Sequence, residues 1–413
     1  MIKRLKIISG VDPREGGPIE GIRQQAVHTA AMGIDEDIVC LDPPDAPWVM
    51  DLPQKVFALG EPLARARSWQ KLLPWRRYGY HPDFVPWLRA HVHDYDLVMV
   101  HGLWNYATMG ARRVLVGADV PYVVFTHGML DPWFKRKYPI KNALKQFFWW
   151  FNEGPLLNNA RFVLFTSEEE KLLARGAFTP YRVRERVIGY GTSDPGGNAA
   201  AQTSAFRALL PGLAKPYLLY LSRIHPKKGC DLLVDAFAEV FGANDDLDLV
   251  MAGPGSSGFV QNLRRQAVAR GIGSRVHWPG MLYGEAKWGA FRNAEAFILP
   301  SHQENFGIAV AEAMACGVPT LITNKVNIWR EVASAGAGLV DSDDVPGVER
   351  LLRRFLAMLP DERTQMRRRA RAAFLELYEV TNAVATINAA CRDAVSGFRV
   401  EGDPKGPASS SSI

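Results

Sequence analysis

Two series of short apolar runs, most of them followed by segments of helical length, constrain this chain more than any other feature of its sequence. Strands that alternate with helices form parallel sheets with helices packed on both faces. A stretch rich in Gly, Ser, Ala and Pro at residues 191–215 separates the two series. The runs of the first series are 5–9, 37–41, 97–101, 122–126 and 161–166, and those of the second are 217–222, 247–253, 275–279, 296–300 and 319–323.

The sequence therefore predicts an α/β protein of two doubly wound, Rossmann-like lobes that face each other across a cleft. In such sheets ligands bind beyond the carboxyl ends of the strands, so we expect the functional site there. The expected organisation is a first lobe at 1–190, a linker at 191–215, a second lobe at 216–375, a C-terminal helix at 376–398 that packs back on the first lobe, and a disordered polar tail at 399–413.

Composition excludes several classes of protein. The 413 residues are 47% hydrophobic and 22% charged, as in ordinary globular proteins. No apolar run approaches the roughly 18 residues of a membrane-spanning helix, and the start of the chain shows no signal-peptide pattern. The cysteines lie far apart without a CxxC pair, which is typical of reduced thiols in the cytoplasm. They are Cys40, Cys230, Cys316 and Cys391.

The net charge of +6 comes mainly from the first 190 residues, where basic and aromatic residues cluster at 65–80 and 133–151. One interpretation is solvated helix faces above an aromatic core. Another is a surface for anionic lipid, with Lys and Arg at the head groups and Trp and Phe at the boundary. No nucleic-acid motif is present, and we expect no nucleic-acid partner.

The segment 300–319, PSHQENFGIAVAEAMACGVP, has the greatest chemical content. A strand ends at Pro300, and we expect a helix to begin near Asn305–Phe306, where its free N–H groups favour a phosphate. Glu304 and Glu312 are eight residues apart, about two helical turns, so both could bind hydroxyls of one elongated ligand. The alternative is that Glu304 only caps the helix and that Glu312 is solvated.

The segment 217–229, YLLYLSRIHPKKG, predicts a strand that leaves into a basic turn. Arg223 and Lys228 follow the strand at its carboxyl end. These two cations could clamp a diphosphate, Arg through its planar fork and Lys as a point charge. An ordinary surface turn is the alternative.

Two glycine-rich loops follow predicted strands. Gly253, Gly255 and Gly258 fit G-x-G-x-x-G, but the acidic residue expected about 20 positions later for a dinucleotide ribose is missing. We therefore interpret this loop as lying near a nucleotide. In the first lobe, Gly16 and Gly17 follow the first strand and let the backbone approach a ligand, or simply form a tight turn.

Two histidines close strands of the first lobe, each before a glycine. His127, in Thr-His-Gly, is the stronger functional candidate, and His101 fits a structural role. The D-x-D pairs at 94–96 and 246–248 stand at strand entries, the wrong end for the cleft. We expect no obligatory metal and no cofactor.

Together these segments resemble the retaining family 4 glycosyltransferases (glycosyl transferases group 1) of the two-lobed GT-B fold. The resemblance rests on the strand with Arg223 and Lys228, the loop at 253–255, and the pattern P-S-x-x-E-x-F-G…E-A-M-A-C-G-x-P, and it is strongest over 216–345. It extends more loosely through the first lobe by the Gly-Gly loop and Thr-His-Gly.

The resemblance implies a role for each matching residue. Arg223 and Lys228 would hold the donor diphosphate, with Gly253 and Gly255 nearby. Glu304 would bind hydroxyls of the donor sugar and Glu312 those of the ribose. Main-chain N–H groups would meet sugar and phosphate, His127 would lie near the reacting carbon, and Gly16 and Gly17 would lie near the phosphates or the acceptor. The main-chain groups belong to Asn305, Phe306, Gly307 and Ile308.

The implied activity is metal-independent transfer of a hexose from GDP-mannose or a UDP-hexose to a glycan or lipid-linked acceptor. It belongs to bacterial exopolysaccharide, capsule or lipopolysaccharide synthesis, in the cytoplasm or peripherally on the inner face of its membrane. Asn305 departs from the family, where many members have Gly, and leaves the donor open. The alternatives are an NAD-dependent oxidoreductase and a non-catalytic nucleotide-sugar-binding protein.

Overall fold

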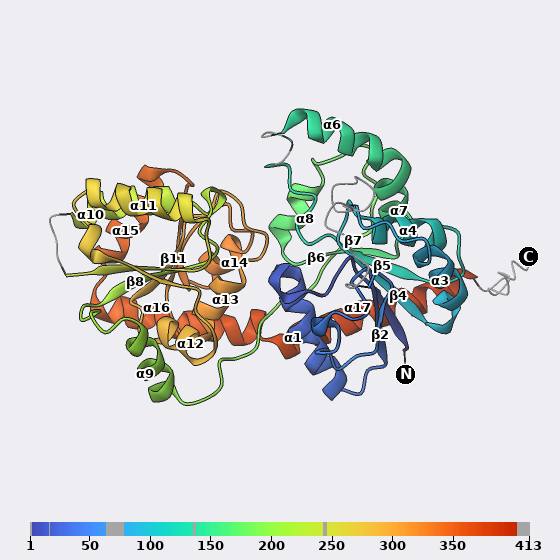
Figure 1. The fold of residues 1–413 in the computed structure, drawn as a ribbon, viewed down its shortest axis with the longest axis horizontal. Helices are drawn as coiled ribbons and strands as arrows, with labels where there is room; N and C mark the ends of the chain where they lie inside the picture. The colour runs from blue at the N-terminus through green and yellow to red at the C-terminus, as the bar shows by residue number, and fades with distance from the viewer. Residues whose placement is uncertain are drawn as a thin grey trace, which may run out of the picture. The chain divides into compact units, whose positions relative to one another are not determined.

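The computed structural model describes residues 2–15, 17–62, 78–133, 135, 138–242 and 246–402. The chain divides into two compact units. Unit 1 comprises Met1–Tyr190 with Val380–Ile413, and unit 2 comprises Gly191–Glu379. Figure 1 shows a twisted sheet with flanking helices in each unit.

Unit 1 contains a seven-stranded sheet in the order β3-β2-β1-β4-β5-β6-β7, in which every pairing is parallel. Its strands are short and their side chains are mostly buried on both faces, as a parallel sheet requires. They are β1 (Arg4–Ile7), β2 (Glu36–Cys40), β3 (Val56–Ala58), β4 (Leu97–His101), β5 (Tyr122–Phe125), β6 (Phe162–Phe165) and β7 (Glu185–Val187).

Alternate residues of β4 show how this sheet supports a core on each face. Val98 and Val100 belong to the larger core cluster, which includes residues of α3, α4 and α7, whereas Leu97 and Met99 pack with residues of α17 on the opposite face. The last helix of the chain therefore completes the core of unit 1 (Figure 1). The helices are α1 (Gly17–Ala31), α3 (Phe84–His91), α4 (Tyr106–Leu115), α6 (Pro139–Phe148), α7 (Gly154–Asn158), α8 (Glu168–Ala174) and α17 (Val380–Gly402).

Unit 2 contains a six-stranded parallel sheet in the order β10-β9-β8-β11-β12-β13. The strands are β8 (Tyr217–Leu221), β9 (Asp248–Ala252), β10 (Val276–Gly280), β11 (Ala296–Leu299), β12 (Thr320–Thr323) and β13 (Gly338–Asp341). The helices are α9 (Ala199–Leu209), α10 (Cys230–Phe241), α11 (Ser257–Ala269), α12 (Gly284–Arg292), α13 (Ile308–Ala315), α14 (Trp329–Ser334), α15 (Val345–Ala357) and α16 (Pro360–Ala373).

The predicted fold class, two Rossmann-like α/β lobes, is confirmed by these two parallel sheets. The predicted linker at 191–215 is wrong in part, because it contains the helix α9. Asn198 caps that helix by accepting N–H bonds from Ala200 and Ala201, and buried Phe206 anchors it to unit 2. An alanine-rich run is a good helix former as well as a typical linker, and only the packing decides between them.

The predicted disordered tail at 399–413 is also wrong at its start, because α17 continues to Gly402. Residues 403–413 lie outside the described part of the chain, as do residues 63–77, which include most of the first basic–aromatic cluster at 65–80. Within the described residues, no helix is long and apolar enough to cross a membrane.

The glycine loop after β9 shows how closely the strand ends of unit 2 approach one another. Gly253 has a φ of 137°, and a Cβ atom built on it would overlap the carbonyl oxygen of Ser222, just after β8. Its own N–H donates to the carbonyl of Gly280 at 2.8 Å. In contrast, Gly258 of the same motif lies in the first turn of α11 with open space around it. The backbone conformation and the close contact therefore require a glycine at position 253 but not at position 258.

We therefore predict opposite effects for alanine at the two positions. Gly253→Ala should lower stability by about 3 kcal/mol or more, since both its conformation and the contact with Ser222 are unfavourable. Gly258→Ala should be neutral or stabilise by up to about 1 kcal/mol, because alanine favours the helix. Thermal unfolding followed by circular dichroism measures both, and equal melting temperatures for the two variants would contradict this account.

Candidate active site

The turn after β8 places two of the predicted cations at the carboxyl end of the sheet. Lys228 lies in a 3₁₀ turn, Pro226–Lys228, and its side chain is only 8% exposed. Gly229 ends the turn with a φ of 64°, and a Cβ atom there would overlap the carbonyl oxygen of Pro300, just after β11. The loops that follow two neighbouring strands are thus in backbone contact, which only glycine permits here.

This contact brings Lys228 to Glu304, two residues predicted to act on one ligand. The Lys228 ammonium forms an ion pair with the Glu304 carboxylate, whose side chain is 21% exposed. The pair is partly shielded from water, so the Coulombic attraction between its two charges is stronger than in a fully exposed pair. A ligand with a phosphate for the lysine and a hydroxyl for the carboxylate would satisfy both groups.

Glu304 is held by strand-like backbone contacts and not by a helix. Its N–H donates to the carbonyl of Lys325 at 2.9 Å, and its carbonyl accepts from the N–H of Asn327 at 3.0 Å. The helix predicted to begin at Asn305–Phe306 begins instead at Ile308. Gly307, with a φ of 76°, cannot lie inside a right-handed helix and precedes its first turn. The inference from two helical turns between Glu304 and Glu312 is therefore wrong.

Glu312 has a different cation as partner. It lies in α13 with its side chain 6% exposed and pairs with Lys287 of α12 at 2.8 Å. The apolar residues around Glu312 predict that its carboxylate is buried, and a buried carboxylate needs a cationic partner. The sequence does not indicate that this cation is Lys287, which lies on another helix.

Arg223 is exposed, while its backbone is fixed. Its carbonyl accepts a hydrogen bond from the buried Tyr220 hydroxyl at 2.8 Å. The next residue, Ile224, forms a parallel bridge with Gly255 and donates its N–H to the carbonyl of Pro254 at 2.7 Å. The structure thus joins the loop of Arg223 to the glycine loop.

Phe306, in the segment 300–319 that also contains Glu304, is buried against Tyr378, with ring centroids 5.4 Å apart.

In unit 1 the two predicted histidines are neighbours. His101 Nδ1 and His127 Nε2 are 3.1 Å apart, and both rings stack near Phe125. Burial lowers the pKa of His127 to about 4 and holds that of His101 well below its usual range. Both imidazoles are therefore neutral at physiological pH, and His127 can serve as a hydrogen-bonding group rather than a cation.

A carboxylate that the sequence analysis missed holds the loop of His127. Glu170 is 3% exposed and accepts from the Thr126 hydroxyl at 2.8 Å and the Gly128 N–H at 2.6 Å, on either side of His127. Its other oxygen accepts from the N–H and hydroxyl of Thr166, both at 2.7 Å. This support matters because His127 has a φ of 49°, unusual for a residue with a side chain. The S-x-x-E pattern from Ser167 to Glu170 is the signal that could have found it.

A second buried carboxyl, Glu153, lies in a π-helical turn (Trp149–Glu153) and supports the loop after β4. It accepts from the N–H of Trp104 at 2.9 Å and from Asn152 at 3.1 Å. Trp104 has a φ of 66°, a second strained non-glycine position in unit 1. Burial raises the pKa of Glu153 to about 7.

Of the two glycines predicted to lie near the ligand in the first lobe, Gly17 begins α1 and Gly16 lies outside the described residues.

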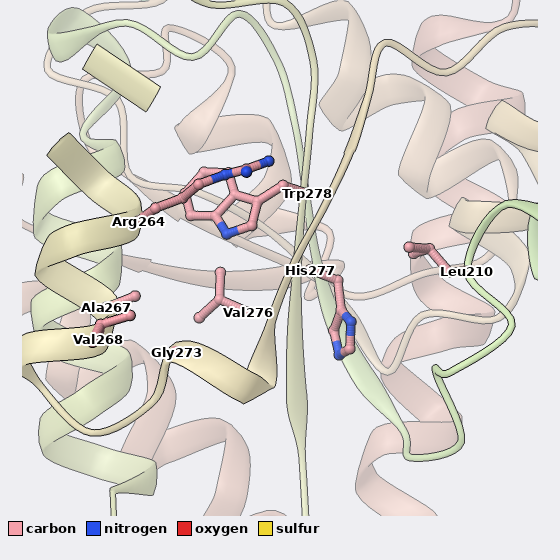
Figure 2. Close-up of a pocket in the computed structure, with 8 residues that line it drawn as sticks. All are labelled: Leu210, Arg264, Ala267, Val268, Gly273, Val276, His277 and Trp278. Carbon is pink, nitrogen blue, oxygen red and sulfur yellow. The ribbon is translucent and has the colours of Figure 1, made fainter. Parts of the chain in front are cut away.

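A hollow of about 400 Å³ in unit 2 lies at the opposite end of the sheet from Glu304. Figure 2 shows its lining, with Arg264 beside Trp278 and residues at the start of β10. His277 pairs there with Asp248 at 2.7 Å, which makes that aspartate a structural partner at a strand entry. In the same way Asp96 accepts a hydrogen bond from the N–H of Lys3 at 2.9 Å.

Among the described residues, no group of three or more His, Cys, Asp or Glu could hold a metal ion.

Two family models match this chain. The model of glycosyl transferases group 1 matches residues 202–373, and that of a glycosyl transferase 4-like domain matches residues 16–191. The two models together match more than four-fifths of the chain, and each matches most of one unit.

Curated relatives align over part of the chain only. A D-inositol 3-phosphate glycosyltransferase of Segniliparus rotundus is 32% identical over 38% of this chain and 34% of its own length. The lipopolysaccharide core biosynthesis mannosyltransferase LpsB of Rhizobium meliloti is 28% identical over 35% of this chain and 42% of its own length. The chain thus spans between about a third and less than half of these relatives.

Solved structures share the fold over nearly the whole chain. The sucrose-phosphate synthase of Thermosynechococcus elongatus has a TM-score of 0.73 at 20% identity, covering 96% of this chain and 100% of its own. Anabaena HepE, in complex with UDP and glucose, has a TM-score of 0.72 at 17% identity, covering 95% of this chain and 100% of its own.

The Glu170 network leads to a stability prediction for unit 1. Glu170→Ala should lower the free energy of unfolding by about 3 kcal/mol or more, because it leaves buried donors of Thr126, Gly128 and Thr166 without an acceptor. Glu168→Ala in the same helix is the control, since the carboxylate of Glu168 is 47% exposed and its pair with Lys171 is partly open to water, and it should cost less than about 1 kcal/mol. Chemical denaturation measures both, and similar midpoints for the two variants would overturn the assigned role of Glu170.

Proposed function

This chain belongs to the group 1 glycosyl transferases, the family 4 enzymes of the GT-B fold, and we propose that it transfers a hexose with retention of the anomeric configuration. The donor is a nucleoside-diphosphate sugar, GDP-mannose or a UDP-hexose, and the acceptor is a hydroxyl of a glycan or a lipid-linked glycan. The process is the synthesis of a bacterial cell-surface polysaccharide, such as exopolysaccharide or lipopolysaccharide.

The pairing of Lys228 with Glu304 is the observation that supports this proposal most. A cation and a carboxylate at the end of one sheet match the two halves of a sugar diphosphate, phosphate oxygens and sugar hydroxyls. Arg223 lies on the same loop as the lysine, and the first turn of α13 offers N–H groups close to Glu304. Glu312, in the same helix, is the proposed partner of the ribose hydroxyls.

In the proposed reaction the bond between the anomeric carbon and the diphosphate oxygen breaks, and the acceptor hydroxyl oxygen bonds to the same face of that carbon. The acceptor proton passes to the leaving diphosphate. Positive charge on the ring and negative charge on the diphosphate grow together, and Arg223 and Lys228 stabilise the latter. We propose that these two cations take the place of a metal ion in this role.

His127 is proposed to act on the sugar as a neutral hydrogen-bonding group. Its lowered pKa supports this role, because a cation beside a ring that is gaining positive charge would oppose the reaction. Glu170 is a positioning residue for His127 in this proposal, through the backbone and side-chain bonds that flank it.

We further propose that unit 1 meets an anionic membrane surface, where a lipid-linked acceptor resides. The support lies in α6, within the cluster at 133–151, whose described part exposes Lys135 and Lys141 together with large apolar side chains. Phe134, Arg136 and Lys137 of this cluster lie outside the described residues. The placement that follows is peripheral, on the cytoplasmic face.

The assigned role of Glu304 leads to a test that separates transfer from nucleotide binding. Glu304→Gln should lower the rate of hexose transfer by a factor of about 100 or more, because the carboxylate that binds the sugar is lost. Affinity for the free nucleoside diphosphate should stay the same or rise, since Lys228 is released for the phosphate. Calorimetry and a transfer assay with the donor that binds the wild type measure the two quantities.

Glu239→Gln, on the exposed face of α10, is the matched control and should change neither quantity. An equal loss of nucleotide affinity and transfer in Glu304→Gln would place Glu304 elsewhere. Unchanged transfer would reject its role altogether.

A further inference from the structure

A pocket of about 310 Å³ in unit 1 combines cationic and aromatic walls. It lies between α4 and the segment where α6 continues into the π-helical turn. One wall carries Arg112 and Arg113, and the other carries Phe147, Phe148 and Phe151. The two arginines lie outside both basic–aromatic clusters that the sequence indicated.

The arginines of this pocket have no carboxylate partner among the described residues. Arg112 is partly buried, and its Nε is fully covered without a hydrogen-bond acceptor in that part of the chain. Arg113 is exposed beside Tyr78 and Tyr106, whose hydroxyls are neutral at physiological pH. Because no carboxylate in the described chain neutralises these two guanidinium groups, an anion in the pocket would supply the missing negative charge.

The aromatic wall is exposed and yet firmly held. The three phenylalanine side chains are between 45% and 60% exposed, and the rings of Phe147 and Phe151 lie 5.0 Å apart. The next residues anchor the segment: Trp149 is fully buried and donates to the carbonyl of Pro180 at 2.8 Å, and Trp150 donates to that of Thr179 at 2.9 Å. The exposed rings therefore belong to an ordered element.

The apolar surface continues from the pocket along α6, which has no buried residue. Ile140 is 79% exposed and Leu144 is 62% exposed, and both belong to the helix that also carries Lys141. Side chains three and four residues apart share one side of a helix, so Ile140, Leu144, Phe147 and Phe151 form a continuous row. An apolar row that starts at a pair of arginines matches an amphiphile with an anionic head and an aliphatic chain.

We propose that this pocket binds one anionic phospholipid of the membrane, with the phosphate on Arg112 and Arg113 and an acyl chain along the phenylalanines and α6. A bidentate guanidinium suits a phosphate diester, and the second arginine favours a lipid of net negative charge over a zwitterionic one. The inference deepens the membrane part of the proposed function, on which it rests, and it does not depend on glycosyl transfer. It assigns a defined lipid site in addition to a charged surface.

Short-chain lipids below their critical micelle concentration test the site without a bilayer. Dihexanoyl phosphatidylglycerol, titrated into the full chain by calorimetry, should bind at least tenfold more tightly than dihexanoyl phosphatidylcholine. The double variant Arg112→Gln, Arg113→Gln should lose about tenfold or more of that affinity. Arg89→Gln, an exposed arginine of α3 in the same unit, is the charge-matched control and should bind as the wild type does.

The variant Phe151→Ser tests the apolar half with little risk to folding, because that side chain is 60% exposed. It should weaken binding of dihexanoyl phosphatidylglycerol while leaving the weaker binding of glycerol 3-phosphate unchanged. Glycerol 3-phosphate binding as tightly as the lipid would reject the apolar wall, and equal binding of the two lipids would reject the arginine pair.

Vesicles of phosphatidylglycerol separate this site from the general surface. If the chain sediments with vesicles but binds no monomeric lipid, the pocket proposal fails and the membrane proposal stands. Concentration-dependent dimers that Phe151→Ser abolishes, without lipid binding, would assign the surface to a second copy and overturn the inference. Lipid binding in the absence of transferase activity would support the site even if the proposed reaction failed.

Discussion

Close backbone contact between the loops that follow neighbouring strands is the constraint on which the site in unit 2 depends. At Gly229 the chain passes so near the carbonyl of Pro300 that no side chain fits, and at Gly253 it passes Ser222 in the same way. The first contact joins the turn of Lys228 to the loop of Glu304, and the second joins the glycine loop to that of Arg223. The ion pair between Lys228 and Glu304 is a consequence of this geometry.

The two units supply groups of different character at the carboxyl ends of their strands. Unit 2 presents two ion pairs, one between Lys228 and Glu304 and one between Lys287 and Glu312. Unit 1 presents two neutral imidazoles, those of His101 and His127, and the buried carboxylate of Glu170 holds the loop of His127. Charged groups suit the diphosphate of the proposed donor, and neutral ones suit a sugar ring that becomes positive during transfer. This division of character is consistent with the proposed reaction.

The sequence predicted the fold, and it predicted that Lys228 and Glu304 lie at the same end of one sheet, because both follow from short-range pattern and one topological rule. Alternating strands and helices indicate parallel sheets, and the rule that strand ends converge places Lys228 and Glu304 in one region. It did not predict the left-handed conformation of Gly307, because glycine adopts both hands and its neighbours determine which. The predicted start of α13, at Asn305–Phe306, therefore differs from the observed start at Ile308.

The sequence also did not predict the hydrogen-bond and ion-pair partners that lie far apart in the chain. Lys287 lies 25 residues before Glu312, and Glu170 lies 44 residues after Thr126, and no periodicity connects them. The sequence does not indicate the pocket either, because Arg112 and Arg113 lie outside both basic–aromatic clusters and only folding places them opposite the phenylalanines. The sequence of α9 fits a linker as well as a helix, because an alanine-rich run is common in both and only packing against unit 2 decides between them.

Calorimetric titration of the protein with UDP, GDP, ADP and NAD, each with and without magnesium, tests whether unit 2 binds a nucleoside diphosphate without a metal ion. We predict that one nucleoside diphosphate binds clearly more tightly than the others, with the same affinity in the presence and absence of magnesium. That ligand would identify the base of the donor. Binding of NAD alone would contradict it, and would make the loop from Gly253 to Gly258 a dinucleotide site.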